Sequence, residues 1–401
     1  MLSFDQALSQ LLGAASALAE ASSLPTLAAA GRVLAQAQRA PIDAPPLDNS
    51  AMDGYAVAVS DVRQVPTRLS VAQRIPAGSV GSPLQPGSAA RIFTGAAIPA
   101  GADAVVMQEL CQHVAGEVTI NHLPEAGDHI RRAGSDIAAG SEILAAGQRL
   151  RPQDTALAAS VGIASLPVLR RLRVAVFFTG DELRMPGEAL QEGAIYNANR
   201  FLLTGLLDAL GCELRDHGQV PDDLVATRQA LRAAALDSDL ILTSGGVSVG
   251  EEDHVKAAVE AEGRLEMWKI AIKPGKPLAF GQVRGAQREV AFIGLPGNPV
   301  SSLVTFLMLV RPFVLKMQGV RRTAPLSYRL RADGEWARPD ARREFLRARI
   351  NAAGGVELFA NQGSGVLTSA VWGDGLVDNP PQQAIRRGDM VRFVPFSELL
   401  S

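Results

Sequence analysis

The first forty residues carry the spacing of amphipathic helices. Ser3 is followed three positions later by Gln6, a capping box in which each side chain satisfies a free backbone amide of the first turn. An Ala- and Leu-rich run extends the helix to Glu20. A second helix is predicted over residues 24–37, with Pro25 in its first turn, where proline is tolerated. The chain is therefore expected to begin with two helices.

Residues 41–139 have a different texture. Prolines and glycines recur between short apolar runs such as 91–93 and 104–107, which is typical of short strands joined by turns. Helical spacing returns over 151–161. This pattern predicts a β-rich module inserted into a helical first domain.

From Leu172 onward, apolar runs alternate with helical spacing. The apolar residues of these runs are consecutive, which indicates a largely parallel sheet that is covered on both faces. Strands are expected at 173–178, 239–243, 278–280 and 290–293, and helices at 199–210, 255–262 and 300–317. Short strands with glycine turns then return, which predicts a small C-terminal β-barrel or sandwich.

The expected fold class is a multidomain α/β chain with a central, mostly parallel α/β domain, an inserted β-rich domain, a helical linker domain and a C-terminal barrel-like domain. The expected boundaries are 1–40 plus 140–170 for the helical first domain, 41–139 for the inserted β-rich domain, 171–320 for the α/β domain and 321–401 for the C-terminal β domain.

Composition agrees with a globular enzyme and excludes some functions. The 401 residues are too many for one core, and 47% of them are hydrophobic and 20% charged. Lysine and arginine number 39 against 41 acidic residues, a formal net charge of −2, so a nucleic-acid partner is not expected. The arginine pairs at 131–132, 170–171 and 342–343 are interpreted as solvated or ion-paired surface.

Cysteine content and hydropathy address the compartment. Cys111 and Cys212 form no CxxC pair, which argues against a disulfide framework and a cysteine-rich zinc site. The first residues lack the basic and apolar regions of a signal peptide. The most apolar stretch, 303–315, is short and contains Arg311 and Pro312, so it is predicted to be a buried helix. We expect a cytoplasmic protein with no membrane partner.

Four loops at strand ends carry the candidate chemistry, because ligands of an open α/β sheet bind beyond the carboxyl ends of its strands. These loops are 179–182, 244–248, 273–277 and 295–301. Their glycines, amides, hydroxyls and lysines can hold phosphate oxygens. Each loop alone is weak evidence, since Gly-Gly and Pro-Gly pairs also mark plain turns. Their joint occurrence predicts a cleft for an anionic ligand.

Acidic residues near the same sheet edge suggest a divalent cation. Asp181, Glu182, Asp222 and Asp253 lie in loops or at predicted helix starts, and Mg²⁺ bound with phosphates uses one or two carboxylates. For Asp222 and Asp253, helix capping is an equal alternative. The five histidines have no ligand spacing, and the P-loop, Rossmann and hydrolase-elbow signatures are absent from the sequence.

The most specific segment is 48–57, with the letters DNSAMDGYAV. It resembles the diagnostic segment of the molybdopterin molybdenumtransferases, the bacterial MoeA family, to which animal gephyrin is related. Further matching segments follow in the family's order and cover nearly the whole chain: 91–96, 103–109, 131–137, 179–183, 244–250, 269–277 and 295–301. Asn197, Ala198 and His254 depart from the family's pattern, which has Asp, Thr or Ser, and Tyr at these positions.

The resemblance implies an elongated, four-part subunit, a homodimer, and an α/β domain that binds molybdopterin. The family's substrates are adenylylated molybdopterin and molybdate; molybdenum is inserted at the dithiolene and AMP is released, with Mg²⁺ as cofactor. The implied protein partners are a molybdopterin adenylyltransferase and the molybdoenzymes that accept the cofactor. Phosphoanhydride cleavage needs positioning and charge neutralisation, which loop amides, lysines and Mg²⁺ supply.

The family's functional residues carry over onto matching positions. The implied catalytic residues are Asp53, Thr94, Asp136, Glu182, Asp222, Asp253, Lys269 and Lys273, and the implied metal ligands are Glu182, Asp222 and Asp253. The cofactor-binding residues are expected to be Ser244, Gly245, Gly246, Ser248, Lys276, Pro296, Gly297, Asn298, Pro299, Arg347 and Ser364. In the family the inserted β-domain of one subunit faces the α/β domain of the other, which would let Asp53 and Asp253 share a site.

Two other hypotheses stay open. A related α/β domain adenylylates molybdopterin in the preceding step, although such proteins lack the 48–55 segment and the flanking β-domains. A non-catalytic molybdopterin-binding or scaffold role is the third hypothesis, since the animal relative also clusters receptors. The full set of acids and lysines argues against a purely structural role.

Overall fold

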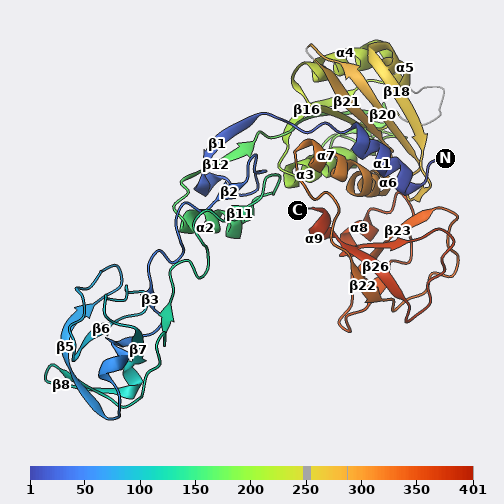
Figure 1. Ribbon diagram of the computed structural model, residues 1–401. Coiled ribbons are helices and arrows are strands. Elements are labelled where there is room, and N and C mark those ends of the chain that lie inside the picture. Colours follow the sequence, from blue (N-terminus) through green and yellow to red (C-terminus); the bar gives the residue numbers. More distant parts are fainter. Residues whose placement is uncertain (247–253, 287, 401) are drawn as a thin grey trace.

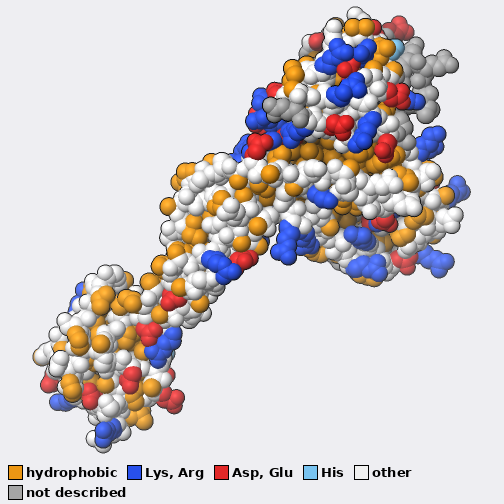
Figure 2. Space-filling view, turned by 45° about the horizontal axis from the view of Figure 1, so that its top comes forward, with side chains coloured by type: hydrophobic (Ala, Val, Ile, Leu, Met, Phe, Trp, Pro, Cys, Tyr) orange, Lys and Arg blue, Asp and Glu red, His pale blue; other side chains and the backbone are white. Residues whose placement is uncertain are grey.

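The computed structural model of the chain describes residues 1–246, 254–286 and 288–400. A distal β-rich lobe is joined by a narrow stem to a body made of the α/β domain and the C-terminal β domain (Figure 1). On the face drawn in Figure 2, acidic, basic and apolar side chains are intermixed over the distal lobe and the body. The stem makes the molecule elongated and holds the distal lobe far from the body (Figure 1).

The α/β domain is built on a six-stranded sheet of order β16-β13-β17-β21-β20-β18. In that order the strands are Glu213–Val220, Arg173–Thr179, Leu240–Ser244, Glu289–Leu295, Pro277–Arg284 and Gly263–Lys269. The first four are parallel to one another; β20 is antiparallel to both of its neighbours, β21 and β18, so β18 runs in the same direction as the first four. The prediction of a largely parallel sheet is confirmed, with an antiparallel edge that the apolar runs did not distinguish.

Both faces of this sheet are buried, which explains why β13 has consecutive apolar residues. Val174 and Val176 pack with α3 (Ala198–Ala209) and the long helix Pro299–Met317, whereas Ala175 and Phe177 pack with α4 (Leu224–Asp237) and α5 (His254–Glu262). Figure 1 shows the two helix layers on opposite sides of the sheet. The long helix consists of α6 (Pro299–Thr305), a π-helical turn (Phe306–Val310) and α7 (Arg311–Met317).

The long helix bears on the membrane prediction. Within the described part of the chain, Pro299–Met317 is the one helix that is long and apolar enough to cross a bilayer, and 94% of its most apolar window is buried inside the protein. It is the core helix that the sequence predicted.

The N-terminal helix α1 spans Phe4–Ala14 and begins with the predicted capping box. Phe4, Ala7 and Leu11 pack into the core of the α/β domain, and Leu2 forms an isolated bridge with Ile270. The expected continuation to Glu20 is wrong, because Ala15 takes an extended conformation and ends the helix.

The helix predicted over 24–37 is also wrong. β1 (Ala21–Pro25) pairs with β12 (Ser165–Leu169), and a single 3-10 turn (Thr26–Ala28) follows. Apolar spacing reported burial only in part here: Leu24 and Leu34 pack in a small core with their backbones bonded to distant strands, whereas Leu27 is 98% exposed. α2 (Pro152–Ser160) supplies the predicted later helix. The first domain is consequently less helical than expected.

The stem continues as two short antiparallel ribbons, β2 (Gln38–Arg39) with β11 (Glu142–Leu144) and β3 (Asn49–Ser50) with β10 (Ile130–Arg131). The distal sheet has the order β7-β4-β6-β5-β9-β8. These strands are Ala104–Met107, Gly54–Val57, Ser88–Ile92, Thr67–Ile75, Glu117–Ile120 and Cys111–Val114, with 3-10 turns at Val59–Asp61 and Gln108–Leu110. The inserted module is thus β-rich.

The C-terminal domain contains a sheet of order β19-β23-β25-β26-β22, with β24 paired to β23. Its strands are Ile272–Lys273, Arg343–Ile350, Gly375–Asn379, Met390–Pro395 and Tyr328–Arg331, with β24 at Val356–Leu358 and helices at Thr368–Trp372 and Phe396–Leu399. Because β19 lies within the sequence of the α/β domain, the α/β domain contributes one strand to the sheet of the C-terminal domain.

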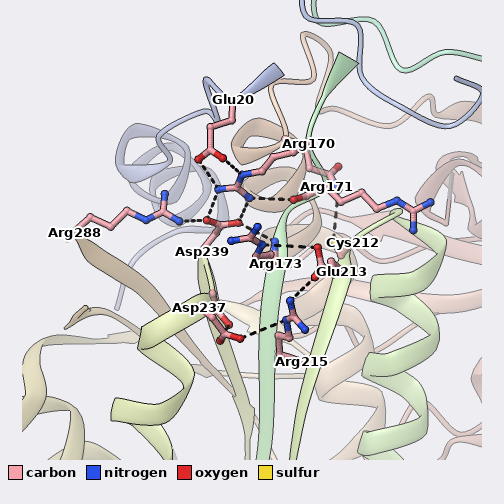
Figure 3. Close-up of polar contacts among 12 residues, drawn as sticks. Glu20, Arg170, Arg171, Arg173, Cys212, Glu213, Arg215, Asp237, Asp239 and Arg288 are labelled. Carbon is pink, nitrogen blue, oxygen red and sulfur yellow. Dashed lines mark hydrogen bonds and ion pairs between the residues drawn. The ribbon is translucent and has the colours of Figure 1, made fainter. Parts of the chain in front are cut away.

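An ion-pair cluster fastens the stem to the α/β domain at the amino ends of the strands (Figure 3). Arg170 leaves β12 and donates to both carboxylate oxygens of Asp239, at 2.6 and 2.9 Å, and also to Glu20. Asp239 additionally accepts from Arg288 and from the backbone amide of Arg173 at 2.8 Å. This cluster lies at the sheet edge opposite the one at which ligands are expected to bind.

Candidate functional site

A cleft of about 770 Å³ lies at the carboxyl ends of β13, β17 and β21. Eleven of the residues predicted to be functional line it: Glu182, Ser244, Gly245, Gly246, Lys273, Lys276, Pro296, Gly297, Asn298, Pro299 and Ser364. The chain continues from β13 through α3 to β16, which is the neighbour of β13 on one side. The neighbour on the other side is β17, so the strand order switches direction at β13 and the cleft lies at this switch point. All four predicted loops contribute to it.

The cleft floor requires glycine after β17. Gly245 and Gly246 have φ of 96° and 63°, and a Cβ atom on Gly245 would lie 2.7 Å from the carbonyl oxygen of Thr179. The backbone can therefore approach both the end of β13 and a ligand closely. A side chain at either position would clash with Thr179, and one at Gly246 would also clash with Val255.

Asn199 cross-links two loops of the cleft, and the sequence alone did not single it out. Its Nδ2 donates to Ser244 Oγ at 2.7 Å and to the carbonyl oxygen of Gly297 at 2.7 Å. Ser244 Oγ also lies 3.2 Å from the carbonyl oxygen of Pro296. The neighbouring Asn197, one of the departures from the family pattern, caps α3 by accepting from the amide of Arg200 at 3.1 Å. The position of Asn197 just before a predicted helix was the sequence signal for this cap.

Asp222 is not the helix cap. Asp223 caps α4 by accepting from the amide of Ala226 at 2.8 Å, which leaves the Asp222 carboxylate for another role. The Asp222 amide donates to Asp181 Oδ1 at 3.3 Å. Burial raises the pKa of Asp222, and the negative charges of Asp181 and Glu182 raise it further. Of these three carboxylates, only Glu182 lines the cleft.

The C-terminal domain brings charges to the cleft that sequence reasoning missed. Lys273 Nζ lies 3.2 Å from Glu344 Oε1 and 3.4 Å from Asp340 Oδ2. Arg342, interpreted from sequence as ion-paired surface, is paired with Asp340 at 2.9 Å and also lines the cleft. These contacts hold the pKa of Asp340 well below its usual range, with the Arg342 hydrogen bonds as the main cause. Lys276 forms no ion pair with any residue in the described ranges.

Two predicted residues lie beside the cleft rather than in it. Lys269 is exposed and pairs with Pro277 at the same sheet edge. Arg347 is fully buried and does not line the cleft. It donates to Ser369 Oγ at 3.0 Å and to the carbonyl oxygen of Gly363 at 3.2 Å. Burial lowers its pKa to about 10. The cofactor contact of Arg347 stays a prediction; in this structure its guanidinium supports the 362–364 loop from behind.

Asp53, Thr94 and Asp136 do not reach the cleft of their own chain. Asp53 Oδ1 accepts from the amide and the hydroxyl of Thr94, both at 2.8 Å, and these bonds lower the pKa of Asp53. Both residues belong to the distal lobe, and Asp136 is exposed where the lobe joins the stem. The lobe lies at the opposite end of the molecule from the α/β domain, whose strand ends form the cleft (Figure 1). Asp253 and Ser248 lie outside the described residues.

A glycine-floored, lysine-bearing cleft at the switch in strand order defines an α/β protein of the molybdopterin-binding class: residues 175–316 match the model of a probable molybdopterin binding domain. Residues 2–162 match the MoeA N-terminal region (domains I and II), and residues 329–396 match the MoeA C-terminal region (domain IV).

Relatives and solved structures agree over the full length. The chain is 42% identical over 408 aligned residues to the molybdopterin molybdenumtransferase of Haemophilus influenzae, with 100% of both chains covered. It is 39% identical to molybdopterin molybdenumtransferase 2 of Mycobacterium tuberculosis, over 89% of this chain and 90% of the relative. A crystal structure of the molybdopterin biosynthesis MoeA protein of Pyrococcus horikoshii matches with a TM-score of 0.86 at 29% identity, covering 98% of this chain and 100% of the other. The chain belongs to the MoeA family of molybdopterin molybdenumtransferases, the enzymes of molybdenum cofactor biosynthesis.

Proposed function

We propose that the chain inserts molybdenum from molybdate into adenylylated molybdopterin and releases AMP. The observation that carries this proposal is the cleft itself, where two glycines, Ser244 and two lysines converge beyond three parallel strands. Such groups bind oxyanions, and both substrates present them, as phosphates or as molybdate. The family membership supplies the reaction, and the cleft supplies a place for it.

The residues of the chain would act on the phosphoanhydride by positioning and charge. The 244–246 and 296–299 turns line the cleft, and the backbone amides of Gly297 and Asn298 would hold phosphate oxygens in a fixed orientation. Lys276 would neutralise negative charge that grows on the departing AMP phosphate as its bond to the molybdopterin phosphate breaks. Lys273 would lie beside the oxyanion that remains with the pterin or beside molybdate.

Mg²⁺ fits the acidic edge of the cleft. The described ranges contain no preformed cluster of three metal-ligating side chains. However, Mg²⁺ keeps most of its waters and needs only one or two carboxylates. Asp222 carries a raised pKa partly because it lies near Asp181 and Glu182, so a cation would be favoured there. Glu182 and Asp222, together with Asp253, would hold the ion, which when bound would neutralise phosphate charge.

The complete site would require two subunits. Asp53 and Thr94 belong to the distal lobe, which lies far along the molecule from the α/β domain that carries Glu182 (Figure 1). A homodimer in which each lobe faces the partner's cleft would bring the two sets together, as isologous association allows. We place this reaction in the cytoplasm, after a molybdopterin adenylyltransferase and before the acceptor molybdoenzymes.

The test is AMP release from purified adenylylated molybdopterin, with and without molybdate, measured by chromatography in Mg²⁺ buffer. Molybdate-dependent AMP release supports the proposal, and Asp253→Asn is expected to abolish it while the protein stays folded. Consumption of ATP with free molybdopterin would instead identify an adenylyltransferase. If neither reaction occurs and molybdopterin still binds, a non-catalytic role replaces this function.

A further inference from the structure

A short stretch of β-structure couples the C-terminal domain to the cleft. β19 of the α/β domain lies parallel to β23 of the C-terminal domain, with Ile272 opposite Arg343 and Lys273 opposite Glu344. The amide of Arg343 donates to the carbonyl oxygen of Ala271 at 3.0 Å. This backbone register, set by two domains, places the Lys273 and Glu344 side chains next to each other.

The Glu344 carboxylate is fully buried and held by three side chains. One oxygen accepts from Trp336 Nε1 at 2.8 Å and lies 3.4 Å from Asn379 Nδ2. The other lies 3.2 Å from Lys273 Nζ. The Glu344 side chain has 0% of its surface exposed. A buried charge is costly unless it is paired, and an apolar residue would pack here without that cost. The position of Glu344 thus favours a task beyond packing.

Lys273 connects this buried carboxylate with the cleft. Its side chain is 35% exposed, lines the cleft and is also paired with Asp340, which Arg342 holds in place. Lysine has a flexible four-carbon stem, so its ammonium group is poorly ordered unless something fixes it. Here Glu344 fixes it from the protein side before any ligand arrives.

The local charges suggest different roles for the two lysines. Lys273 and Arg342 are balanced by Asp340 and Glu344, so this group as a whole adds no net charge to the cleft. Lys276 forms no ion pair among the residues that the structure describes, and its charge is not offset in this way. Anion attraction therefore falls to Lys276, and Lys273 offers a fixed position.

We infer that Glu344 is a positioning residue for the reaction, which acts by holding the Lys273 ammonium group at one point of the cleft. This inference rests on the proposed function. Glu344 touches no substrate in this scheme, and its effect passes through Lys273. An interaction set in advance for the transition state raises turnover more than it raises ground-state affinity.

The decisive variant is Glu344→Gln, which keeps the side-chain volume and an oxygen that can accept from Trp336. We expect kcat for molybdate-dependent AMP release to fall at least about 10-fold, because misplacement of a reacting group has effects of that size or larger. The KM for molybdate should stay the same or decrease, since a negative charge near the anion has been removed. Equilibrium dialysis with molybdate alone should show the same unweakened affinity.

Two comparisons separate positioning from stability. In a Lys273→Met background, Glu344→Gln should lower kcat no further, because residues that act through one another are not additive. Asp378→Asn is the matched control: Asp378 is a buried carboxylate on the neighbouring strand β25, paired with Arg343 and Arg392. This control should lower the melting temperature and leave kcat of the folded protein unchanged.

The outcomes are distinct. The inference would be overturned, with the proposed function still standing, by either of two results. One is an unchanged kcat in Glu344→Gln, and the other is a fall in kcat in the Lys273→Met background as large as the fall in the wild-type background. If Glu344→Gln does not fold, Trp336→Phe removes the hydrogen bond to Glu344 and should lower kcat about threefold, again only when Lys273 is present. An inactive wild-type enzyme would instead contradict the proposed function. Equilibrium dialysis would still test whether Glu344→Gln binds molybdate at least as tightly as the wild type does.

Discussion

Replacing Asp239 by alanine should loosen the joint between the stem and the α/β domain (Figure 3). The Asp239 side chain has 0% of its surface exposed, and it accepts from Arg170, from Arg288 and from the amide of Arg173. Alanine would leave Arg170, only 16% exposed, without its principal counter-charge.

The expected cost follows from this burial. Removing one partner of a buried ion pair destabilises proteins by roughly 3–5 kcal/mol, because the remaining charge stays buried. Arg170 would keep Glu20, which is 69% exposed and offers weaker compensation. We therefore expect a loss of about 3 kcal/mol, at the lower end of that range.

Denaturant unfolding, combined with hydrogen exchange of peptides from β12, β13 and β17, would measure this loss where it arises. Global unfolding of a multidomain chain need not be two-state, so the local exchange rates decide the result. Glu213→Gln is the control, since Glu213 and Arg215 are each 41% exposed and such pairs contribute at most about 1 kcal/mol. Equal protection in wild type and Asp239→Ala would refute the reasoning.

Three further predictions concern single side chains. Thr94→Val removes the hydroxyl that donates to Asp53 at 2.8 Å, so the pKa of Asp53 should rise and kcat should fall about 10-fold, whereas Thr94→Ser should retain activity. Lys276→Ala should weaken molybdate binding about 10-fold in equilibrium dialysis, because a charge-assisted contact is lost, and unchanged affinity would exclude Lys276 from the anion site. Arg232 and Arg228 lower the pKa of Glu262 to about 2. The ion pairs of Glu262 therefore stabilise the fold fully above its ordinary pKa of 4.5, and this stabilisation is lost as the pH falls toward 2. Glu262→Gln should remove that part of the pH dependence of the melting temperature.

The sequence predicted the α/β domain well, because consecutive apolar residues report burial on both faces directly. Val174 to Phe178 alternate between two cores, as a doubly covered strand must. The backbone of segment 24–37 was not predicted. Val33 and Leu34 are buried but Leu27 is 98% exposed, and β1 bonds to β12, which is far along the chain. Helical and extended backbones bury similarly spaced residues when a distant partner is available, and local spacing does not reveal that partner.

The candidate site was predictable where it lies on strand ends and unpredictable where it depends on contacts between domains. Loops 244–246 and 296–299 follow strands, so their place at one sheet edge followed from topology. Arg342 lines the cleft, and Glu344 lies next to Lys273, only because β19 joins the C-terminal sheet. Arg347 was expected to touch the cofactor, but the structure buries it, an uncommon position for arginine that residue type does not suggest.

The most direct test of the shared site mixes two inactive variants, Asp53→Asn and Glu182→Gln. After subunit exchange, half of the dimers would be mixed, and each mixed dimer would contain one site in which both residues are native, so molybdate-dependent AMP release should recover to about a quarter of the wild-type rate. If each cleft were completed within its own chain, every site would keep one defect. Activity of the mixture no higher than that of the separate variants would contradict the two-subunit site.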